Sequence, residues 1–562
     1  MRGPRPTGFM SQPEPRSFGS LARGRQLVAG NFLFAGFLIE TPRASAPQQI
    51  WDLPSPALRF DQELHGFLWL DDLAALGTPE ARARAQSWLW GWIERYGNGR
   101  GPGWAPDLIG RRLIRCINHA VFLLHGQDKA ASAAYFDSLG RQYNVLSRRW
   151  SRATPGLARF EALAGLVYAG LSLSGMERNV APALTALEAE CEAEIDSDGG
   201  LATRNPEHLM EVFVLLSWIT EAREAAGRFP RPALRTAMER IAPTLRALRH
   251  SDGSLARFHG GGRGLEGRLD QALSAAGVRG TARTQGLAMG FARLTAGRTT
   301  LIADAAPPPT GRAASEAHAS TLAFELTSGR RPLIVNCGSG AAFGDAWLRA
   351  GRASEAHSTL SLDGESSSRL ALSAQGGGLD FVPSDVRVQI TRNATGHFMM
   401  IGHDGYAESH GLTHVRKITL SRDGRLVGGR ETLGALTERQ RARFDARLTE
   451  TRMQGVPFSL RFHLHPEVDA TLDMRGNAVS LLLRSGEVWV FRQAGQCTMS
   501  LEPSIYLEAG RLKPRAAQQI VLSGRVLDFS AQISWTLDKA EDTPRAIRDL
   551  AARLGEDDAA FT

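Results

Sequence analysis

The sequence has few cysteines, no long apolar run and no block of basic residues. Its four cysteines are far apart and form no CxxC pair: Cys116, Cys191, Cys337 and Cys497. This spacing argues against both a disulfide framework and a zinc ribbon. No stretch is long and apolar enough to span a bilayer, and no fixed-length repeat predicts a solenoid. The chain must therefore be stabilised by ordinary packed cores.

The charge is positive but dispersed. The net charge of +8 comes from 66 basic and 58 acidic residues, and the surplus is spread along the chain. It is compatible with an anionic partner such as an acidic polysaccharide, a nucleic acid or a membrane surface, and it selects none of them. Arginine richness can equally follow genome composition. Because there is no basic helix and no aromatic–basic platform, we do not expect a nucleic-acid partner.

The length of 562 residues predicts two or three domains. Residues 1–50 are expected to form an N-terminal extension that is partly disordered, because its first 25 residues are rich in Pro, Gly and Arg. Leu27–Ile39 followed by Ala44-Ser45-Ala46 superficially resembles an export signal. However, Asn31 interrupts the apolar run and Pro47 would obstruct cleavage. We interpret this segment as folded protein, with an export signal as the alternative.

Residues 51–298 are predicted to form a helical domain. Thr78-Pro79 has the pattern of a helix N-terminus, with Thr as the cap and Pro in the first turn. Apolar residues then recur at helical spacing along several segments, namely Asp107–Leu124, Phe160–Leu173, Pro182–Ala193, Pro206–Ala222 and Pro232–Leu248. Many amphipathic helices with short connections favour an array of helical hairpins.

The pattern changes after about residue 295. Ala305–Gly311, with three consecutive prolines, is predicted to be a boundary loop. Short β-prone runs separated by tight-turn signals follow, with no regular intervening helices, so residues 312–540 predict an antiparallel β-sandwich. Residues 541–562 are expected to form a helix at Pro544–Leu554 and a tail. The predicted class is thus α+β multidomain.

An ordered set of motifs lies in the β-rich half. These are Ala317-His318-Ala319 before Leu322–Leu326, then Leu333–Gly338, Trp347-Leu348-Arg349, Ala356-His357-Ser358-Thr359-Leu360, Leu362-Asp363-Gly364, His403–Tyr406, Gly411–Arg416 and Phe462–Pro466. In this order they resemble the C-terminal domain of the heparinase II/III family of polysaccharide lyases. The resemblance covers roughly residues 300–530 well, and the helical half less specifically. It implies a helical (α/α) toroid followed by an antiparallel β-sandwich, in agreement with the segment pattern.

The resemblance also implies chemistry, namely β-elimination at uronic acids. One group neutralises the sugar carboxylate, a Tyr or His removes the C5 proton, and an acid protonates the departing oxygen. Some members hold a structural zinc through two His and one Asp. By resemblance His318 and His357 fall on the two ligand histidines, while Asn336 replaces the Asp and is a poorer ligand. The alternative is that both histidines hydrogen-bond Asn336 and stabilise the strands.

The catalytic positions of the family are substituted in this chain. Glu316 stands where the family has its sandwich histidine, and Ala158 falls near the expected asparagine motif of the helical half. His208 takes the tyrosine position when the prolines are aligned, so the resemblance implies His208 as base. Imidazole suits that role because its pKa lies near neutrality. Equally, Asn205-Pro206-Glu207 is a good helix start without catalysis.

Further candidates come from the strands. His403 and Tyr406 flank Asp404-Gly405, a turn-like context from which both side chains could face a cleft. His414 and Arg416 alternate onto one strand face. Arg204, Arg349 and Arg416 are candidate clamps for a substrate carboxylate.

The leading prediction is a polysaccharide lyase-like protein that cleaves a uronate-containing acidic glycan, heparin- or heparan-like or related. The alternative is a non-catalytic glycan-binding or envelope-assembly protein on a degenerate lyase fold, favoured by the residues at Ala158, Glu316 and Asn336. The expected partner is an acidic polysaccharide, with no transmembrane segment, and the only cofactor considered is the structural zinc. The resemblance implies the cell envelope or periplasm, with the cytoplasm as the alternative. The sequence leaves the glycan and the oligomeric state open.

Overall fold

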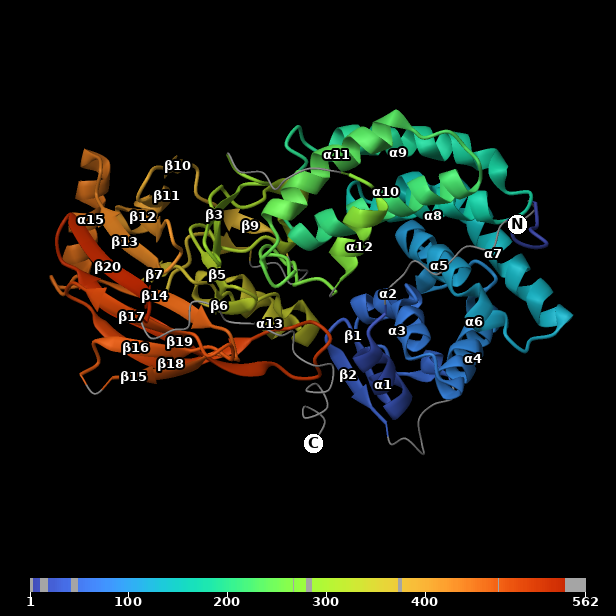
Figure 1. Ribbon diagram of the computed structural model, residues 1–562, viewed down its shortest axis with the longest axis horizontal. Coiled ribbons are helices and arrows are strands. Elements are labelled where there is room, and N and C mark those ends of the chain that lie inside the picture. Colours follow the sequence, from blue (N-terminus) through green and yellow to red (C-terminus); the bar gives the residue numbers. More distant parts are fainter. Residues whose placement is uncertain are drawn as a thin grey trace.

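The computed structural model describes residues 4–10, 19–41, 49–265, 267–278, 286–371, 377–473 and 475–540. Helices fill the first half of the chain and antiparallel sheets fill the second, as Figure 1 shows. The helix predicted at Pro544–Leu554 lies outside the described residues. Among the helices that are described, none has the length and apolar character needed to cross a membrane.

The N-terminal extension contains ordered elements. Helix α1 (Leu21–Ala29) starts at Ser20, whose side chain accepts a hydrogen bond from the Arg23 N–H, and it leads into a hairpin of β1 (Asn31–Phe34) and β2 (Phe37–Glu40). Phe32 and Phe34 are fully buried. The interpretation of Leu27–Ile39 as folded protein is therefore confirmed. Partial disorder was predicted for residues 1–50, and the segment from Ser20 to Thr41 is ordered.

The helical half follows the predicted segments with small shifts. Its helices are α2 (Leu58–His65), α3 (Leu68–Leu76), α4 (Pro79–Tyr96), α5 (Pro106–Asn118), α6 (Ala120–Leu124), α7 (Lys129–Arg149), α8 (Leu157–Ser172), α9 (Val180–Glu194), α10 (Pro206–Ala225), α11 (Pro232–Ala247) and α12 (Arg268–Ala275). The Thr78 side chain caps α4 as expected. The single helix predicted over Asp107–Leu124 is wrong, because His119 leaves helical geometry between α5 and α6 and bonds Asp71 at 2.8 Å.

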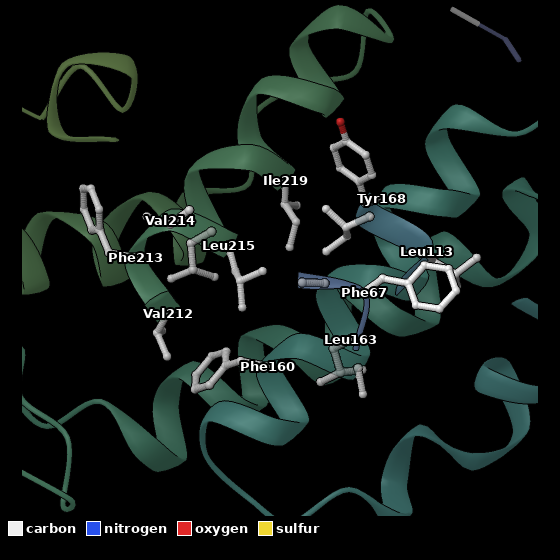
Figure 2. Packing of buried hydrophobic residues seen from close by; sticks show 14 of the residues in the cluster. Phe67, Leu113, Phe160, Leu163, Tyr168, Val212, Phe213, Val214, Leu215 and Ile219 are labelled. Carbon is white, nitrogen blue, oxygen red and sulfur yellow. The ribbon is translucent and has the colours of Figure 1, made fainter. Parts of the chain in front are cut away.

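One apolar cluster fills the interior of the helical half. Figure 2 shows Phe160 and Leu163 of α8 packed near Leu215 and Ile219 of α10 and Leu113 of α5. Gly110 and Gly165 allow α5 and α8 to approach closely, since a Cβ on Gly165 would lie 2.3 Å from the Gly110 Cα. Tight packing between successive helices is what closes them into the curved array of Figure 1.

The strands of the second half pair antiparallel and range from two residues in β8 to 12 residues in β19. They are β3 (Phe291–Ala296), β4 (Thr299–Asp304), β5 (Phe324–Ser328), β6 (Arg331–Val335), β7 (Leu360–Leu362), β8 (Arg369–Leu370), β9 (Leu379–Phe381), β10 (Val386–Arg392), β11 (Gly396–Tyr406), β12 (Leu412–Ser421), β13 (Leu426–Gly434), β14 (Val456–Leu464), β15 (Asp469–Leu472), β16 (Ala478–Leu482), β17 (Val488–Ala494), β18 (Thr498–Tyr506), β19 (Arg515–Val526) and β20 (Ser530–Lys539).

Two large sheets form among the described residues. One runs in the order β10-β11-β12-β13-β20-β17-β16-β15 and the other in the order β18-β19-β14-β6-β5-β4-β3, with β7 beside β14. Trp535 of the first sheet stacks on Phe324 and meets the Phe462 ring edge of the second, at centroid distances of 5.9 and 4.9 Å. The sheets thus pack face to face over a shared aromatic core, and the predicted antiparallel sandwich is confirmed.

Two features of the second half differ from the prediction. The sheet begins at Phe291, because β3 pairs with β4 and β4 pairs with β5, so the sandwich starts before the expected boundary at residue 312. Helices α13 (Asp345–Arg352), α14 (Ala407–His410) and α15 (Glu438–Glu450) lie between strands. The sequence does carry a signal for α15, because Thr437 and Gln440 form a reciprocal capping box.

Buried polar contacts join the two halves. Arg257 donates to the carbonyl oxygens of Cys337 and Leu507, and His250 lies 3.2 Å from Glu325. The tip of the N-terminal hairpin also reaches the sandwich, since a Cβ on Gly36 would lie 2.5 Å from the Ala342 carbonyl carbon. Arg59 of α2 pairs with Asp345 of α13 at 2.8 Å.

Candidate functional site

The N-terminus of α10 lies where the helical half meets the sandwich. Asn205 caps this helix, because its Oδ1 accepts hydrogen bonds from the backbone N–H groups of Glu207 and His208. The next turn presents His208, whose Nε2 lies 3.6 Å from Glu316 Oε2 at the end of the 3₁₀ segment Gly311–Glu316. The side chains of His208 and Glu316 are 27% and 50% exposed. Of the predicted catalytic residues, the structure brings these two together.

Charged residues of α5, α8, α10 and α12 continue from this point. Arg111 pairs with Glu161 at 2.7 Å, and Arg268 pairs with Glu211 at 2.7 Å. Burial raises the pKa of both Glu161 and Glu207, and the Glu211 carboxylate raises each further. These groups therefore form one electrostatically connected row. With Asp107 and Glu316 included, carboxylates outnumber guanidinium groups in it.

Arg204 is not available as a clamp for a substrate carboxylate. Its Nη2 lies 2.5 Å from Asp304 Oδ1, and the remaining N–H groups donate to backbone carbonyls of the chain segments around Met289 and Pro307. The Arg204 guanidinium holds the pKa of Asp304 well below its usual range. Arg204 thus fixes the boundary loop to β4.

Arg416 is likewise committed to an internal carboxylate. Its Nε bonds both oxygens of Glu431 at 2.8 and 3.0 Å, and its Nη1 donates to the carbonyls of Leu322 and Ser358. His414 binds the same carboxylate at 2.8 Å, so the predicted shared face of His414 and Arg416 is confirmed. That face points into the sandwich, where all three side chains are fully buried. The Arg416 guanidinium lowers the pKa of Glu431 to about 2, against the cost of burial.

His403 and Tyr406 lie in strand β11 and not in a turn, because β11 extends to Tyr406. Both are buried. The Tyr406 hydroxyl donates to the Leu360 carbonyl at 2.9 Å, and burial raises its pKa. Burial also holds the pKa of His403 well below its usual value, and its Nδ1 accepts the Gly405 N–H. The structure does not bring this pair to His208. Arg349, in contrast, is exposed on α13.

The residues at the implied zinc position do not fit a site of two histidines and one carboxylate. His318 Nδ1 and His357 Nε2 bind each other at 3.0 Å, while the remaining ring nitrogens bind the Gly260 N–H and the Ala353 carbonyl. Asn336 Oδ1 accepts the Ser358 N–H instead of facing a metal. Among the residues that the structure describes, no group of three His, Cys, Asp or Glu side chains is arranged to hold a metal. The expected hydrogen bonds from both histidines to Asn336 are replaced by the bond between the histidines.

Sequence reasoning missed the buried carboxylates that bind the candidate arginines. Glu431 lies opposite Arg416 in the β12–β13 register, and Asp304 is 100 residues from Arg204. It also missed His259, whose Nδ1 accepts the His318 N–H and whose Nε2 lies 3.5 Å from Asp304. A strand-pairing prediction for β12 and β13 could have found Glu431. No sequence signal links Arg204 to Asp304.

The architecture defines a class: an α/α toroid joined to an antiparallel β-sandwich, as in polysaccharide lyases. A family model described as heparinase II/III-like, C-terminal, matches residues 278–536. Two solved structures share the fold at 13% identity. Heparinase III has a TM-score of 0.66 over 96% of this chain and 88% of that one, and a mutant heparan sulfate lyase from Pedobacter heparinus has a TM-score of 0.58 over 97% and 87%.

A curated relative is more similar in sequence. FtsZ-localized protein C of Caulobacter vibrioides is 31% identical over 547 residues, which cover 96% of this chain and 91% of the relative. The chain belongs to the heparinase II/III-like family, and it is similar over nearly its whole length to a relative named for its localisation with FtsZ.

Proposed function

We propose that this chain is a non-catalytic member of the lyase fold that acts as a binding and assembly protein at the FtsZ-containing division apparatus. The observation that carries the first part of the proposal is the charge at the α10 N-terminus. The carboxylate of Glu316 stands 3.6 Å from His208, where β-elimination needs a positive or hydrogen-bond-donating group to neutralise the uronate.

Electrostatics weigh against a uronate at this position. Two carboxylates at contact distance repel each other, so the Glu316 carboxylate disfavours a uronate beside His208. Arg204 and Arg416 already bind Asp304 and Glu431, and freeing either would leave a buried carboxylate unpaired. Asn205 uses its Oδ1 as a helix cap, and its Nδ2 lies 3.5 Å from Glu316. These contacts support a site that does not accept the charge of a uronate.

The second part of the proposal rests on the relative in Caulobacter vibrioides, which shares more than twice the sequence identity of the matched lyases and spans almost the whole chain. FtsZ acts in the cytoplasm, so the proposal favours the cytoplasmic alternative over a periplasmic one. The polysaccharide-binding role of the fold would then be lost or redirected.

The first experiment tests for catalysis. The purified full-length chain is incubated with heparin, heparan sulfate, chondroitin and alginate, and the absorbance of the unsaturated uronate product is followed beside an active heparinase. We expect no product. Product that disappears in His208→Ala would overturn the non-catalytic proposal and establish His208 as a catalytic base.

The second experiment tests association with FtsZ. Co-sedimentation with polymerised FtsZ is compared with unpolymerised FtsZ and with FtsZ-free pellets. We expect the chain to pellet with polymers, and His208→Ala and Glu316→Gln to pellet equally well. If the chain stays in the supernatant, the assembly part of the proposal fails, whatever the uronate assay gives.

A second candidate function, retained β-elimination, is favoured by one observation. A half-buried imidazole beside a carboxylate resembles a base held in orientation by an acid. The uronate assay with His208→Ala distinguishes this candidate directly.

A further inference from the structure

Arginines gather where the loop of residues 260–263 meets the connection between β18 and β19. Among the described residues, three guanidinium groups share the Glu508 carboxylate, with N–O distances of 3.4 Å from Arg263, 3.2 Å from Arg511 and 3.7 Å from Arg515. Arg263 belongs to the helical half, whereas Arg511 and Arg515 belong to the sandwich. The cluster therefore spans the boundary between the halves, where Figure 1 shows the connection after β18 reaching toward the helices.

A fourth guanidinium group, that of Arg257, lies beside this cluster. It covers the Tyr506 ring at 4.0 Å and donates to the carbonyl oxygens of Cys337 and Leu507. Within the part of the chain that the structure describes, no carboxylate oxygen lies within 4.0 Å of this guanidinium. Arg257 is only 6% exposed, so solvent screens its charge poorly. The positive charge at this place is thus partly buried and has a single carboxylate, that of Glu508, in direct contact.

The next carboxylates along the chain are bound to other groups. Asp252 accepts hydrogen bonds from the N–H and the hydroxyl of Ser254. Glu325 lies 3.2 Å from His250 and accepts the backbone N–H of Arg257. An incoming anion would therefore meet more positive than negative charge at the cluster.

The cluster also has N–H donors to spare. The Arg515 side chain makes no hydrogen bond to any described residue, and the Arg263 side chain makes one, to Glu508 at 3.4 Å. These two arginine side chains are 30% and 43% exposed, so a small ligand can reach them. Planar guanidinium groups bind phosphoryl oxygens through paired N–H donors, which makes arginine the preferred residue for this chemistry.

A neutral imidazole adds an uncharged donor. His465 packs edge-on against Tyr506 with ring centroids 5.0 Å apart, and its Nδ1 accepts the Glu467 N–H. Burial holds the pKa of His465 well below its usual value, and the charges of Arg515 and Arg257 lower it further. The ring is therefore neutral with its proton on Nε2. The fields of these arginines act together at one place.

We propose that this arginine cluster is a binding site for hydrogen phosphate. The dianion compensates the excess positive charge, and its oxygens accept from Arg263 and Arg515 across the boundary between the halves. Glu508 gives the site its selectivity, because hydrogen phosphate keeps a proton that it donates to a carboxylate, whereas sulfate has none and is repelled. The inference goes beyond the proposed function, since it adds a small-ligand site that association with FtsZ does not require.

Isothermal titration calorimetry of the full-length chain tests the ligand. Sodium phosphate, sodium sulfate and glycerol 3-phosphate are compared at equal ionic strength and at a pH of about 8, where a phosphate ester has lost its second proton. We expect phosphate to bind at least tenfold more tightly than either of the others, and to raise the melting temperature. No phosphate binding, or equal or tighter binding of sulfate or of the ester, would overturn the proposal.

Arg515→Gln tests the position of the site. This variant removes a charge and its donors without breaking a hydrogen bond between described residues, so we expect a wild-type melting temperature without phosphate and about tenfold weaker phosphate binding. Arg492→Gln is the matched control, because Arg492 on the other sheet pairs with Asp538 at the same 3.7 Å that separates Arg515 from Glu508. Unchanged affinity in Arg515→Gln, or an equal loss in both variants, would refute the site.

Glu508→Gln tests the selectivity. Without the carboxylate charge, we expect sulfate to bind about tenfold more tightly than it binds wild type, so that the preference for phosphate disappears. A folded Glu508→Gln variant that still prefers phosphate over sulfate as wild type does would contradict the role of Glu508. The Arg515→Gln comparison decides the proposal by itself if Glu508→Gln does not fold.

Discussion

His208 of α10 and Glu316 of the sandwich-side segment face each other at 3.6 Å across the boundary between the two halves of the chain. Both side chains are partly exposed, whereas the other predicted site residues, Arg349 excepted, are buried. Solvent therefore reaches this contact.

An exposed pair of this kind should contribute little to stability. We expect His208→Ala and Glu316→Gln to change the free energy of unfolding by less than about 1 kcal/mol each, because solvent screens the interaction and side-chain entropy opposes it. Urea unfolding followed by circular dichroism measures this. A loss above about 2 kcal/mol would mean that the pair holds the two halves together.

The buried Arg416–Glu431 pair should behave in the opposite way. Glu431→Gln leaves the Arg416 guanidinium uncompensated inside the sandwich, so we expect a loss of about 3–5 kcal/mol. Urea unfolding of Glu431→Gln and of Glu316→Gln compares the same substitution at a buried site and at an exposed site. Similar losses at both positions would contradict the assignment of Arg416 to a structural role.

The pH dependence follows from the same pair. The pKa of Glu431 is lowered from 4.5 to about 2 in the folded chain. Its contribution to stability is therefore complete above pH 4.5 and is lost as the pH falls toward 2, with a total of about 3 kcal/mol. Unfolding free energies between pH 5 and pH 2 should fall more steeply in wild type than in Glu431→Gln. Parallel slopes would show that other carboxylates carry the acid sensitivity.

The two-part fold was predictable because it depends on local patterns. Helical spacing, the Thr78 cap and the alternation of short β-prone runs each carry their own signal. The boundary was misplaced because the prolines of Ala305–Gly311 lie inside the β half, after β3 and β4. A loop signal marks a turn in the chain and does not say which sheet the flanking strands join.

The site was less predictable because its residues act through distant partners. Strand alternation gave the common face of His414 and Arg416 correctly, but only the pairing with Glu431 on β13 reveals that this face is interior. Similarly, Asp404-Gly405 was interpreted as a turn, whereas it lies within β11, at a shift in the register with β12 between His403 and Tyr406. In both cases the pairing between strands, which the local sequence does not show, determines where these side chains lie.

The chain should not require zinc. His318 and His357 satisfy each other, and Asn336 supplies a neutral amide that binds the Ser358 N–H. We expect purified protein dialysed against zinc to hold substoichiometric metal by elemental analysis, and chelation to leave the melting temperature unchanged. Asn336→Asp is the informative variant, since it restores a carboxylate at the third position. Stoichiometric zinc in the wild-type chain, with a fall in melting temperature on chelation, would contradict this prediction.

The docking of the N-terminal hairpin on the sandwich depends on Gly36. Its φ of +83° favours glycine, and a Cβ would lie 2.5 Å from the Ala342 carbonyl carbon and 2.6 Å from the Phe343 nitrogen. Gly36→Ala must therefore strain the turn and also push the hairpin away from the sandwich. We expect a loss of about 1–3 kcal/mol in the free energy of unfolding and faster hydrogen exchange in β1, β2 and the segment around Ala342.

Gly364→Ala is the matched control, because Gly364 has a φ of +73° but open space around it, so this variant adds the backbone strain without the collision. Equal stability losses and unchanged exchange of β1 and β2 in both variants would show that the hairpin does not depend on this contact.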